Sequence, residues 1–311
     1  MLWTRILIKD VGSEPHSANQ HQIMFKSKDG TPRWGCNAIY RVSHGRLAYG
    51  KNRVIVDFTH YNYFLDNGGH TGDGVFTFDA NTGKDDKVAF IFKTSHSVEL
   101  RLMYDGLSIF VASMGDMYPL NLVFDKVELK KDSEVDIPFK SLLAVDKSVI
   151  IGDGSGGSTG RFGSITDLND TTIAVPYTRR KGTMNSHGVS ENCEFSEFVL
   201  CLIDKALFTK NNIVLDSSSD RDIRFLKSAK YGSNFLIAYV SCPYESEPYG
   251  QNKPEKNYPV NFMMLDQEGN LLDEQKHEGL FVNGSSDFEI LNNGNVIWTA
   301  IDENDMLFLI F

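Results

Sequence analysis

The feature that most constrains the fold of this chain is an apolar hairpin that recurs at a nearly constant interval. Each copy has two short apolar or alternating runs joined by a turn rich in Gly, Asn or Asp, the pattern of two antiparallel strands. The second strands of the five copies start at Arg53, Ser108, Thr172, Phe235 and Asn295, so successive starts are 55, 64, 63 and 60 residues apart. This period indicates one supersecondary unit used repeatedly.

The turn residues place the strands within each copy. In the first copy we expect strands Ala38–Val42 and Arg53–Phe58, with the turn region at His44-Gly45. The other four hairpins are expected at residues 98–112, 164–175, 223–240 and 288–300. Asp105-Gly106 and Asn293-Gly294 are predicted to form tight turns, because these dipeptides tolerate the positive φ that such turns require.

A third strand follows each hairpin, and in four copies it ends in an aspartate. These strands are expected at Val75–Asp79, Asn121–Asp125, Leu200–Asp204 and Phe262–Asp266, with Leu307–Phe311 as the fifth counterpart. The turns Asn81-Thr82-Gly83 and Gln267-Glu268-Gly269 permit a reversal into a fourth strand. Fourth strands are expected at residues 87–93, 134–140, 212–217 and 271–276. Each copy is therefore predicted to be a four-stranded antiparallel meander.

A four-stranded sheet repeated in this way resembles the β-propeller class, which includes WD-repeat, PQQ-type and five-bladed proteins. GVFTFDANTGK at Gly74–Lys84 looks like a strand and turn of a PQQ-type blade, but the tryptophan that should follow is missing, so no cofactor is expected. The resemblance implies an all-β fold in which residues 1–311 form a single β-propeller of four-stranded antiparallel blades. Five blades are favoured, and six are the alternative if residues 5–10, 21–26 and 142–151 form a separate sheet.

Ring closure and the apolar second strands lead to two further expectations. We expect residues 5–10 or 21–26 to pair with the C-terminal blade, residues 288–311, because the last copy supplies three strands. The second strands are almost continuously apolar, which is typical of sheets covered on both faces. We therefore expect burial between blades for one side chain in each of four second strands: Phe110, Val175, Ile237 and Trp298.

Charge and segment composition exclude several classes of function. Lys and Arg total 31 against 41 Asp and Glu, and the formal net charge of -10 would repel a nucleic-acid backbone. No segment approaches the roughly 18 apolar residues of a membrane span, and no signal peptide is visible. A cytoplasmic location is slightly favoured over secretion. The four cysteines form no C-x-x-C pair, and no metal is expected.

Five polar residues near strand ends form the first candidate site. His70 and Asp73 precede the third strand of the first copy, His96 and Arg101 border the next hairpin, and Asp116 follows its second strand. Because connections in a repeated meander return to the same two faces, we expect these side chains near one end of the first two blades. Such a group is typical of acid–base or metal sites. The alternative, which we favour, is that they brace adjacent blades.

Long connections between second and third strands form the second candidate site. They are expected at Thr59–Gly74, Thr178–Asn192 and Cys242–Tyr258, and equivalent insertions in repeated units emerge on one face. Tyr244 and Tyr249 in the last of them suit recognition of a protein or a sugar. The sequence therefore predicts a noncatalytic binding or scaffold propeller with a protein or glycan partner, and it leaves the oligomeric state open.

A carbohydrate-active hydrolase or lyase is the alternative function. It requires carboxylates that converge at the channel mouth, and the candidates are Asp73, Asp116, Asp153 and Asp222. The glycine-rich segment Gly152–Gly163 is expected to be a long surface loop, and its sequence does not decide between an anion and calcium as ligand.

Overall fold

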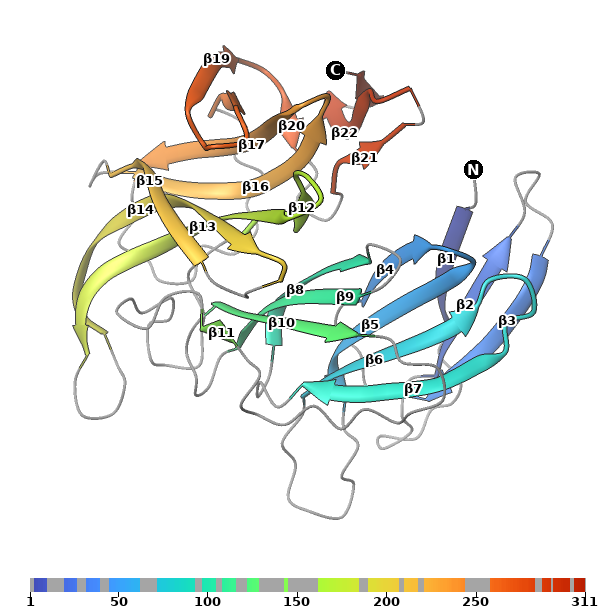
Figure 1. Cartoon of the computed structure of the whole chain (residues 1–311). Helices are drawn as coiled ribbons and strands as arrows, with labels where there is room; N and C mark the ends of the chain where they lie inside the picture. The colour runs from blue at the N-terminus through green and yellow to red at the C-terminus, as the bar shows by residue number, and fades with distance from the viewer. Residues whose placement is uncertain are drawn as a thin grey trace. The chain divides into compact units, whose positions relative to one another are not determined.

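The computed structural model describes only part of the chain (Figure 1). The described residues are 3–9, 20–26, 32–39, 45–61, 72–92, 97–104, 108–115, 122–128, 143–144, 162–184, 190–206, 210–217, 221–243, 258–282, 287–291, 293–302 and 305–310. In these ranges the regular structure is antiparallel β-sheet. The chain divides into two compact units, residues 1–143 and 144–311, and each is described by itself.

The strands of the first unit form three sheets in chain order. Sheet 1 contains β1 (Trp3–Lys9), β2 (Gln20–Lys26) and β3 (Pro32–Ile39). Sheet 2 contains β4 (Gly45–Gly50), β5 (Arg53–Tyr61), β6 (Gly72–Asp79) and β7 (Asp85–Phe92). Sheet 3 contains β8 (Ser97–Tyr104), β9 (Ser108–Gly115), β10 (Leu122–Glu128) and β11 (Leu143–Ala144).

The described strands of the second unit also form three sheets. Sheet 4 contains β12 (Thr166–Asp167), β13 (Thr172–Met184), β14 (Ser190–Asp204) and β15 (Lys210–Asp216). Sheet 5 contains β16 (Arg221–Tyr231), β17 (Asn234–Pro243), β18 (Val260–Leu265) and β19 (Leu271–His277). Sheet 6 contains β20 (Phe281–Val282), β21 (Glu289–Ile290), β22 (Val296–Asp302) and β23 (Asp305–Ile310), with β20 and β21 along one side of β22 and β23 along the other.

The predicted meander is confirmed in most copies, and the first hairpin was placed wrongly. Its first strand is β4, not Ala38–Val42, and its turn is Lys51-Asn52, not His44-Gly45. Lys51 and Asn52 have φ of 44° and 63°, as a two-residue hairpin turn requires, and Gly50 pairs with Arg53 across it. The signal was missed because a Lys-Asn pair is a weaker turn signature than a glycine-containing one.

The N-terminal residues form a sheet of their own among the described strands. β2 is hydrogen-bonded to β1 on one side and to β3 on the other, so it has no edge left for a further strand. The described residues thus contain six sheets, as in the six-blade alternative, but β3 takes the place expected for residues 142–151. Pairing of residues 5–10 with the C-terminal blade stays a prediction.

The connection predicted at Thr178–Asn192 is mostly regular structure. β13 and β14 continue as a long hairpin from the Thr172–Asp204 pair to the Met184–Ser190 pair, with a bulge between Lys181 and Thr183. Residues 62–71 and 244–257, in the other two predicted long connections, lie outside the described residues, as do Asp105-Gly106 and residues 134–140.

Sheet 5 packs between sheets 4 and 6, and this packing forms the core of the second unit. On one face, Ile237 and Met263 join Phe198 and Leu200 of sheet 4 in a buried apolar cluster. On the other face, residues of β16, β17 and β18 pack against Phe288, Val296 and Trp298 of sheet 6. Both faces of one sheet are thereby removed from water, which explains why its central strands are apolar almost without interruption.

The predicted burial of four second-strand side chains is confirmed. Phe110, Val175 and Ile237 are fully buried, and Trp298 is 1% exposed. The Asn293-Gly294 turn is confirmed as well: Gly294 has φ of 85°, and its N–H donates to the carbonyl of Leu291.

We expect Trp298→Ala to lower the free energy of unfolding by about 3–5 kcal/mol, because the indole fills the space between sheets 5 and 6. Its ring contacts Phe262 and Phe288 edge to face, with centroids 6.2 and 5.2 Å away. Urea unfolding measures the change. Ile290→Ala, at an exposed position in the same sheet, is the control and should change stability by less than about 1 kcal/mol. Equal effects of the two variants would contradict this packing.

Candidate functional site

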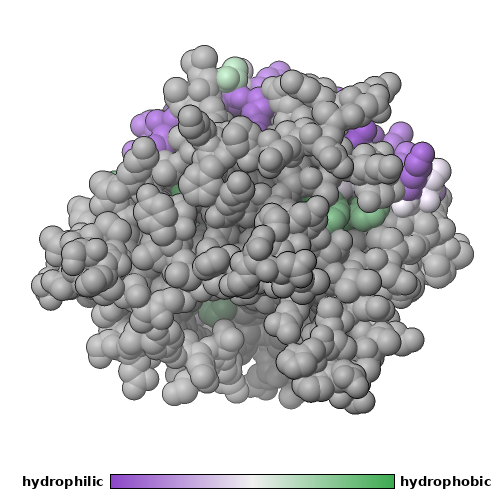
Figure 2. Space-filling view, turned by 90° about the horizontal axis from the view of Figure 1, so that it is seen from below, coloured by the Kyte–Doolittle hydropathy of each residue, from purple (hydrophilic) through white to green (hydrophobic). Residues whose placement is uncertain are grey.

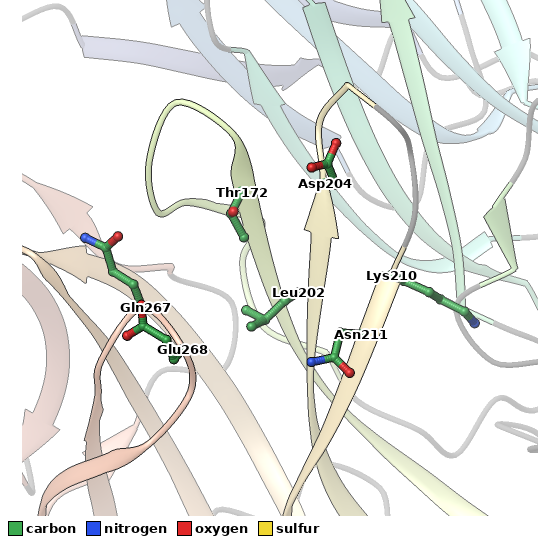
Figure 3. Close-up of a pocket in the computed structure, with 7 residues that line it drawn as sticks. All are labelled: Thr172, Leu202, Asp204, Lys210, Asn211, Gln267 and Glu268. Atoms are coloured by element: carbon green, nitrogen blue, oxygen red, sulfur yellow. The ribbon is translucent and has the colours of Figure 1, made fainter.

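A groove of about 410 Å³ lies at one end of sheets 4 and 5 (Figure 3). It is lined by Thr172, Leu202, Asp204, Lys210, Asn211, Gln267 and Glu268. Figure 3 shows that Gln267 and Glu268 come from one turn and that the other side chains come from three strands of sheet 4. The groove therefore combines residues from two neighbouring sheets of the second unit.

Strand register explains why these residues meet. Thr172, the first residue of β13, pairs with Asp204, the last residue of β14, and Leu202 pairs with Asn211 of β15. Gln267 and Glu268 lie in the turn between β18 and β19. The groove is thus at the tight-turn end of the strands, whereas the long connections predicted to bind a partner leave the opposite end.

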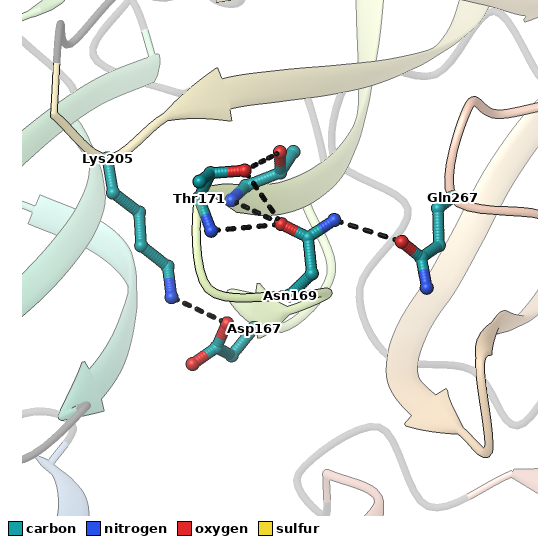
Figure 4. Close-up of polar contacts among 6 residues, drawn as sticks. Asp167, Asn169, Thr171, Lys205 and Gln267 are labelled. Atoms are coloured by element: carbon teal, nitrogen blue, oxygen red, sulfur yellow. Dashed lines mark hydrogen bonds and ion pairs between the residues drawn. The ribbon is translucent and has the colours of Figure 1, made fainter.

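The turn after β12 is held rigidly by one asparagine. Asn169 Oδ1 accepts hydrogen bonds from the N–H groups of Thr171 and Thr172, at 3.0 and 2.9 Å, and from the Thr171 hydroxyl at 3.0 Å. The same side chain donates from Nδ2 to Gln267 Oε1 at 3.0 Å (Figure 4). Gln267 in turn donates to the carbonyl of Ser233 at 3.2 Å. This chain of bonds couples the rim of sheet 4 to that of sheet 5.

An ion pair fixes the other side of the same turn. Lys205 Nζ lies 2.7 Å from Asp167 Oδ1, and the Lys205 N–H donates to the carbonyl of Thr171. Because the Asp167 side chain is 44% exposed, solvent screens the pair, and its contribution to stability is about 1 kcal/mol or less. Its role in the groove is to hold the backbone next to Asp204.

The turn that carries Gln267 and Glu268 is organised by Asp266. Its carboxylate accepts hydrogen bonds from the N–H groups of Glu268 and Asn270 and from the Asn270 side chain. These bonds, led by the Asn270 side chain, lower the pKa of Asp266 below its ordinary value of 3.8. Gly269 completes the turn with φ of 88°, and a Cβ there would lie 2.6 Å from Ile213 Cδ1 of sheet 4.

The groove presents both hydrogen-bond donors and hydrogen-bond acceptors. The amides of Asn211 and Gln267 and the hydroxyl of Thr172 supply donors and acceptors, while Asp204 and Glu268 supply carboxylates. One Asp204 oxygen already accepts the N–H of Ala206 at 2.8 Å. No aromatic side chain is among the residues that line it. Its chemistry therefore suits a hydroxyl-rich or amide-rich ligand more than an apolar one.

A second polar cluster lies between sheets 5 and 6. Lys227 of β16 is 1% exposed, and its Nζ lies 3.1 Å from Asp287 Oδ1. A β-bulge in β16 sets Phe225 and Leu226 opposite a single residue of β17, and Phe225 has φ of 52°. The extra residue shifts the alternation of side chains between the two faces of the sheet, so that Lys227 lies on the face toward sheet 6. The pKa of Glu289 is raised, mainly by desolvation of its carboxyl group and to a smaller extent by the negative charge of Asp287.

Two of the residues predicted from sequence for a site lie in described strands. Asp73 is in β6, opposite Phe92, and Arg101 is in β8, opposite Ala112, with a side chain only 3% exposed. His70, His96, Asp116, Tyr244 and Tyr249 lie outside the described residues. The proximity of His70, Asp73, His96, Arg101 and Asp116 stays a prediction. So does the convergence of four carboxylates, of which Asp116 and Asp153 lie outside the described residues and Asp73 and Asp222 lie in β6 and β16.

The groove residues were missed because no motif marks them. The sequence did indicate the turn at Gln267-Glu268-Gly269 and the aspartate at the end of β14, but only as punctuation between strands. Nothing in the local pattern shows that the β18–β19 turn lies against sheet 4. That juxtaposition depends on the packing of the two sheets.

In the described residues, no three or more His, Cys, Asp and Glu side chains are placed to hold a metal ion. No helix in the same ranges is long and apolar enough to cross a membrane. Cys201 is a buried thiol within β14, as its apolar surroundings in the sequence predict. In the space-filling view of Figure 2, hydrophilic described residues are visible with a few hydrophobic ones among them.

Comparison with known proteins identifies the fold. No protein-family profile matches the chain, and no curated protein matches it significantly in sequence. An ancestral GH74 enzyme superposes with a TM-score of 0.53 at 8% identity, over 99% of this chain and 40% of that one. An α-L-arabinofuranosidase from Clostridium thermocellum gives 0.47 at 9% identity, over 85% of this chain and 88% of that one. An endo-arabinase from Bacteroides thetaiotaomicron gives 0.44 at 9% identity, over 86% and 92%.

This similarity concerns the fold alone. The predicted class is confirmed: the protein has the all-β fold of a β-propeller, and the antiparallel sheets that serve as blades are four-stranded in the described residues except for sheet 1. The chain spans less than half of the GH74 enzyme that it resembles.

The lowered pKa of Asp266 leads to a pH-dependent prediction. A carboxyl whose pKa is lower in the folded state stabilises the fold above its ordinary value of 3.8 and loses this contribution as the pH falls through the folded value. Asp266→Asn should therefore lower the urea midpoint at neutral pH, and its difference from the wild type should shrink below about pH 3.8. A difference that is constant with pH would contradict a role for the charge.

Proposed function

We propose that the protein is a noncatalytic binding propeller that holds a hydroxyl-rich ligand, a glycan, in the groove at the turn end of sheets 4 and 5. The observation that supports this most is the bonded rim: Asn169 of sheet 4 donates to Gln267 of sheet 5, and Gln267 donates to the Ser233 carbonyl within sheet 5. A site whose backbone is fixed before binding loses less entropy when a ligand enters. The volume is in the range of small-molecule sites.

The lining matches a sugar in kind. Sugar hydroxyls both donate and accept, and Asn211, Gln267 and the two carboxylates offer both functions within one concave surface. A protein partner would need a broader contact than this groove, since stable protein interfaces bury roughly 800 Å² on each side. A protein partner at the predicted long-connection face is the other outcome that a binding screen would detect.

The test is binding to an array of neutral oligosaccharides, followed by titration of the best one. The double variant Asn211→Ala/Glu268→Ala should bind about 5- to 150-fold more weakly, because it removes two hydrogen-bonding groups of about 0.5–1.5 kcal/mol each. Both side chains are exposed, so the melting temperature should not change. Asp170→Ala, exposed in the adjacent turn, is the matched control. No retained oligosaccharide at millimolar concentration would refute the proposal.

A carbohydrate hydrolase is the second candidate, and the cluster between sheets 5 and 6 favours it. Asp287 forms an ion pair with Lys227, while the pKa of Glu289 is raised, and glycoside hydrolysis uses one ionised and one protonated carboxyl group. If these residues act, the wild type should release reducing sugar from an oligosaccharide. Asp287→Asn and Glu289→Gln should each reduce that release by about 10²-fold or more. Binding of the oligosaccharide without any release of reducing sugar would exclude the hydrolase and support the noncatalytic function.

A further inference from the structure

Strand β19 is the outermost strand of sheet 5 and is open to solvent along its length. All seven of its residues are exposed, and β18 is its neighbour in the sheet order. An edge strand of this length presents backbone N–H and C=O groups that can pair with another strand. The outer strand of sheet 4, β15, differs: several of its residues are half-buried, and the β18–β19 turn packs against its Ile213.

The charges of β19 change sign at Gln275. Residues 273–277 read Asp-Glu-Gln-Lys-His, with two acids before Gln275 and two basic side chains after it. In an antiparallel ladder, hydrogen-bonded and non-hydrogen-bonded pairs alternate, so a two-fold axis between identical strands must pass through a pair of identical residues. With the axis at Gln275, Glu274 of each copy faces Lys276 of the other, and Asp273 faces His277.

The side chains that would meet are compatible with this pairing. Glu274 and Lys276 are two residues apart and so project from the same face of the strand. The Tyr239 hydroxyl donates to Glu274 Oε1 at 3.1 Å and orients the carboxylate, which has further acceptor capacity. Lys276 lies 3.4 Å from Glu278, but both side chains are more than half exposed, and such surface pairs exchange readily.

Apolar surface lies beside the charged centre. Leu271 and Leu272, at the start of β19, are 56% and 53% exposed, which is unusual for large apolar side chains on one strand. Two-fold pairing would place these leucines at both ends of the joined strands. Their partial burial would add a hydrophobic contribution to the backbone and charge contacts.

We propose that β19 pairs with β19 of a second copy of this chain, antiparallel about Gln275, so that sheet 5 continues across a two-fold axis. The contact is isologous, and the same surface patch serves both copies. It is smaller than a standard protein interface, so the dimer forms at raised protein concentration. The contact uses the outer edge of sheet 5, whereas the groove is lined by residues at its turn end, so it goes beyond the proposed ligand binding.

Sedimentation of the full chain tests the association. The mass of the 35.0 kDa chain should approach twice that value as its concentration rises from about 1 to about 500 μM. A mass that stays at one chain throughout this range would overturn the proposal. Gln275→Pro distorts β19 at the axis and should shift the dissociation constant upward by at least about tenfold.

Charge reversal tests the register. Glu274→Lys alone and Lys276→Glu alone each place like charges opposite one another twice, so each should abolish the dimer in this range. An equal mixture of the two single variants should form a heterodimer, because one chain then carries two lysines and the other two glutamates. The double variant Glu274→Lys/Lys276→Glu should dimerise with itself again.

The control is Lys84→Glu, an exposed charge reversal in the turn after β6, which should leave the dimer unchanged. Melting temperatures identify any variant that fails to fold, since Glu274→Lys also loses the bond from Tyr239. In that case Lys276→Glu and Gln275→Pro still test the strand. Dimerisation that persists in both of these variants, or a mixture of single variants that stays monomeric, would refute pairing through β19.

Discussion

The burial of both faces of sheet 5 is the constraint on which the described structure of the second unit depends. Leu226 and Ile237 pack toward sheet 4, while Ala229 and Trp298 meet on the side of sheet 6. A two-sided apolar sheet is unstable in water by itself, so its neighbours must lie against it. The close approach at Gly163, where a Cβ would lie 2.7 Å from Pro176 Cγ and 3.0 Å from Ser228 Oγ, shows how tightly the packed region is filled.

Polar contacts then fix how the packed blades are aligned. The Ser228 hydroxyl donates to the carbonyl of Ser164, Asn169 bonds Gln267, and Lys227 pairs with Asp287. The buried pair stands out, because removing one member would leave an uncompensated charge between two sheets. A buried ion pair is a weak source of net stability, and its effect here is on the alignment of sheets 5 and 6.

The aspartates that end the third strands have a structural use that bears on function. Asp79 accepts bonds from the N–H groups of Asn81 and Thr82, and Asp266 does the same in its own turn. Hydrogen bonds from the Thr82 and Asn270 side chains, and then from backbone N–H groups of the same turns, lower the pKa values of these two carboxylates. Repeated acids in a chain of this type are therefore poor evidence for catalysis. The groove depends indirectly on Asp266, since this residue shapes the turn that carries Gln267 and Glu268.

The amino-acid sequence by itself determined the local structure: the meanders, the buried second strands at Phe110 and Trp298, and the turns at Gly269 and Gly294. Alternating hydrophobicity and positive-φ turns act over a few residues, so they can be read along the chain. It missed the Lys51-Asn52 turn, whose residues adopt positive φ without glycine. Only the tertiary structure decided which turn lies beside which sheet. The groove joins Thr172 to Gln267 across 95 residues, and such contacts arise from the packing of whole sheets, which no local pattern encodes.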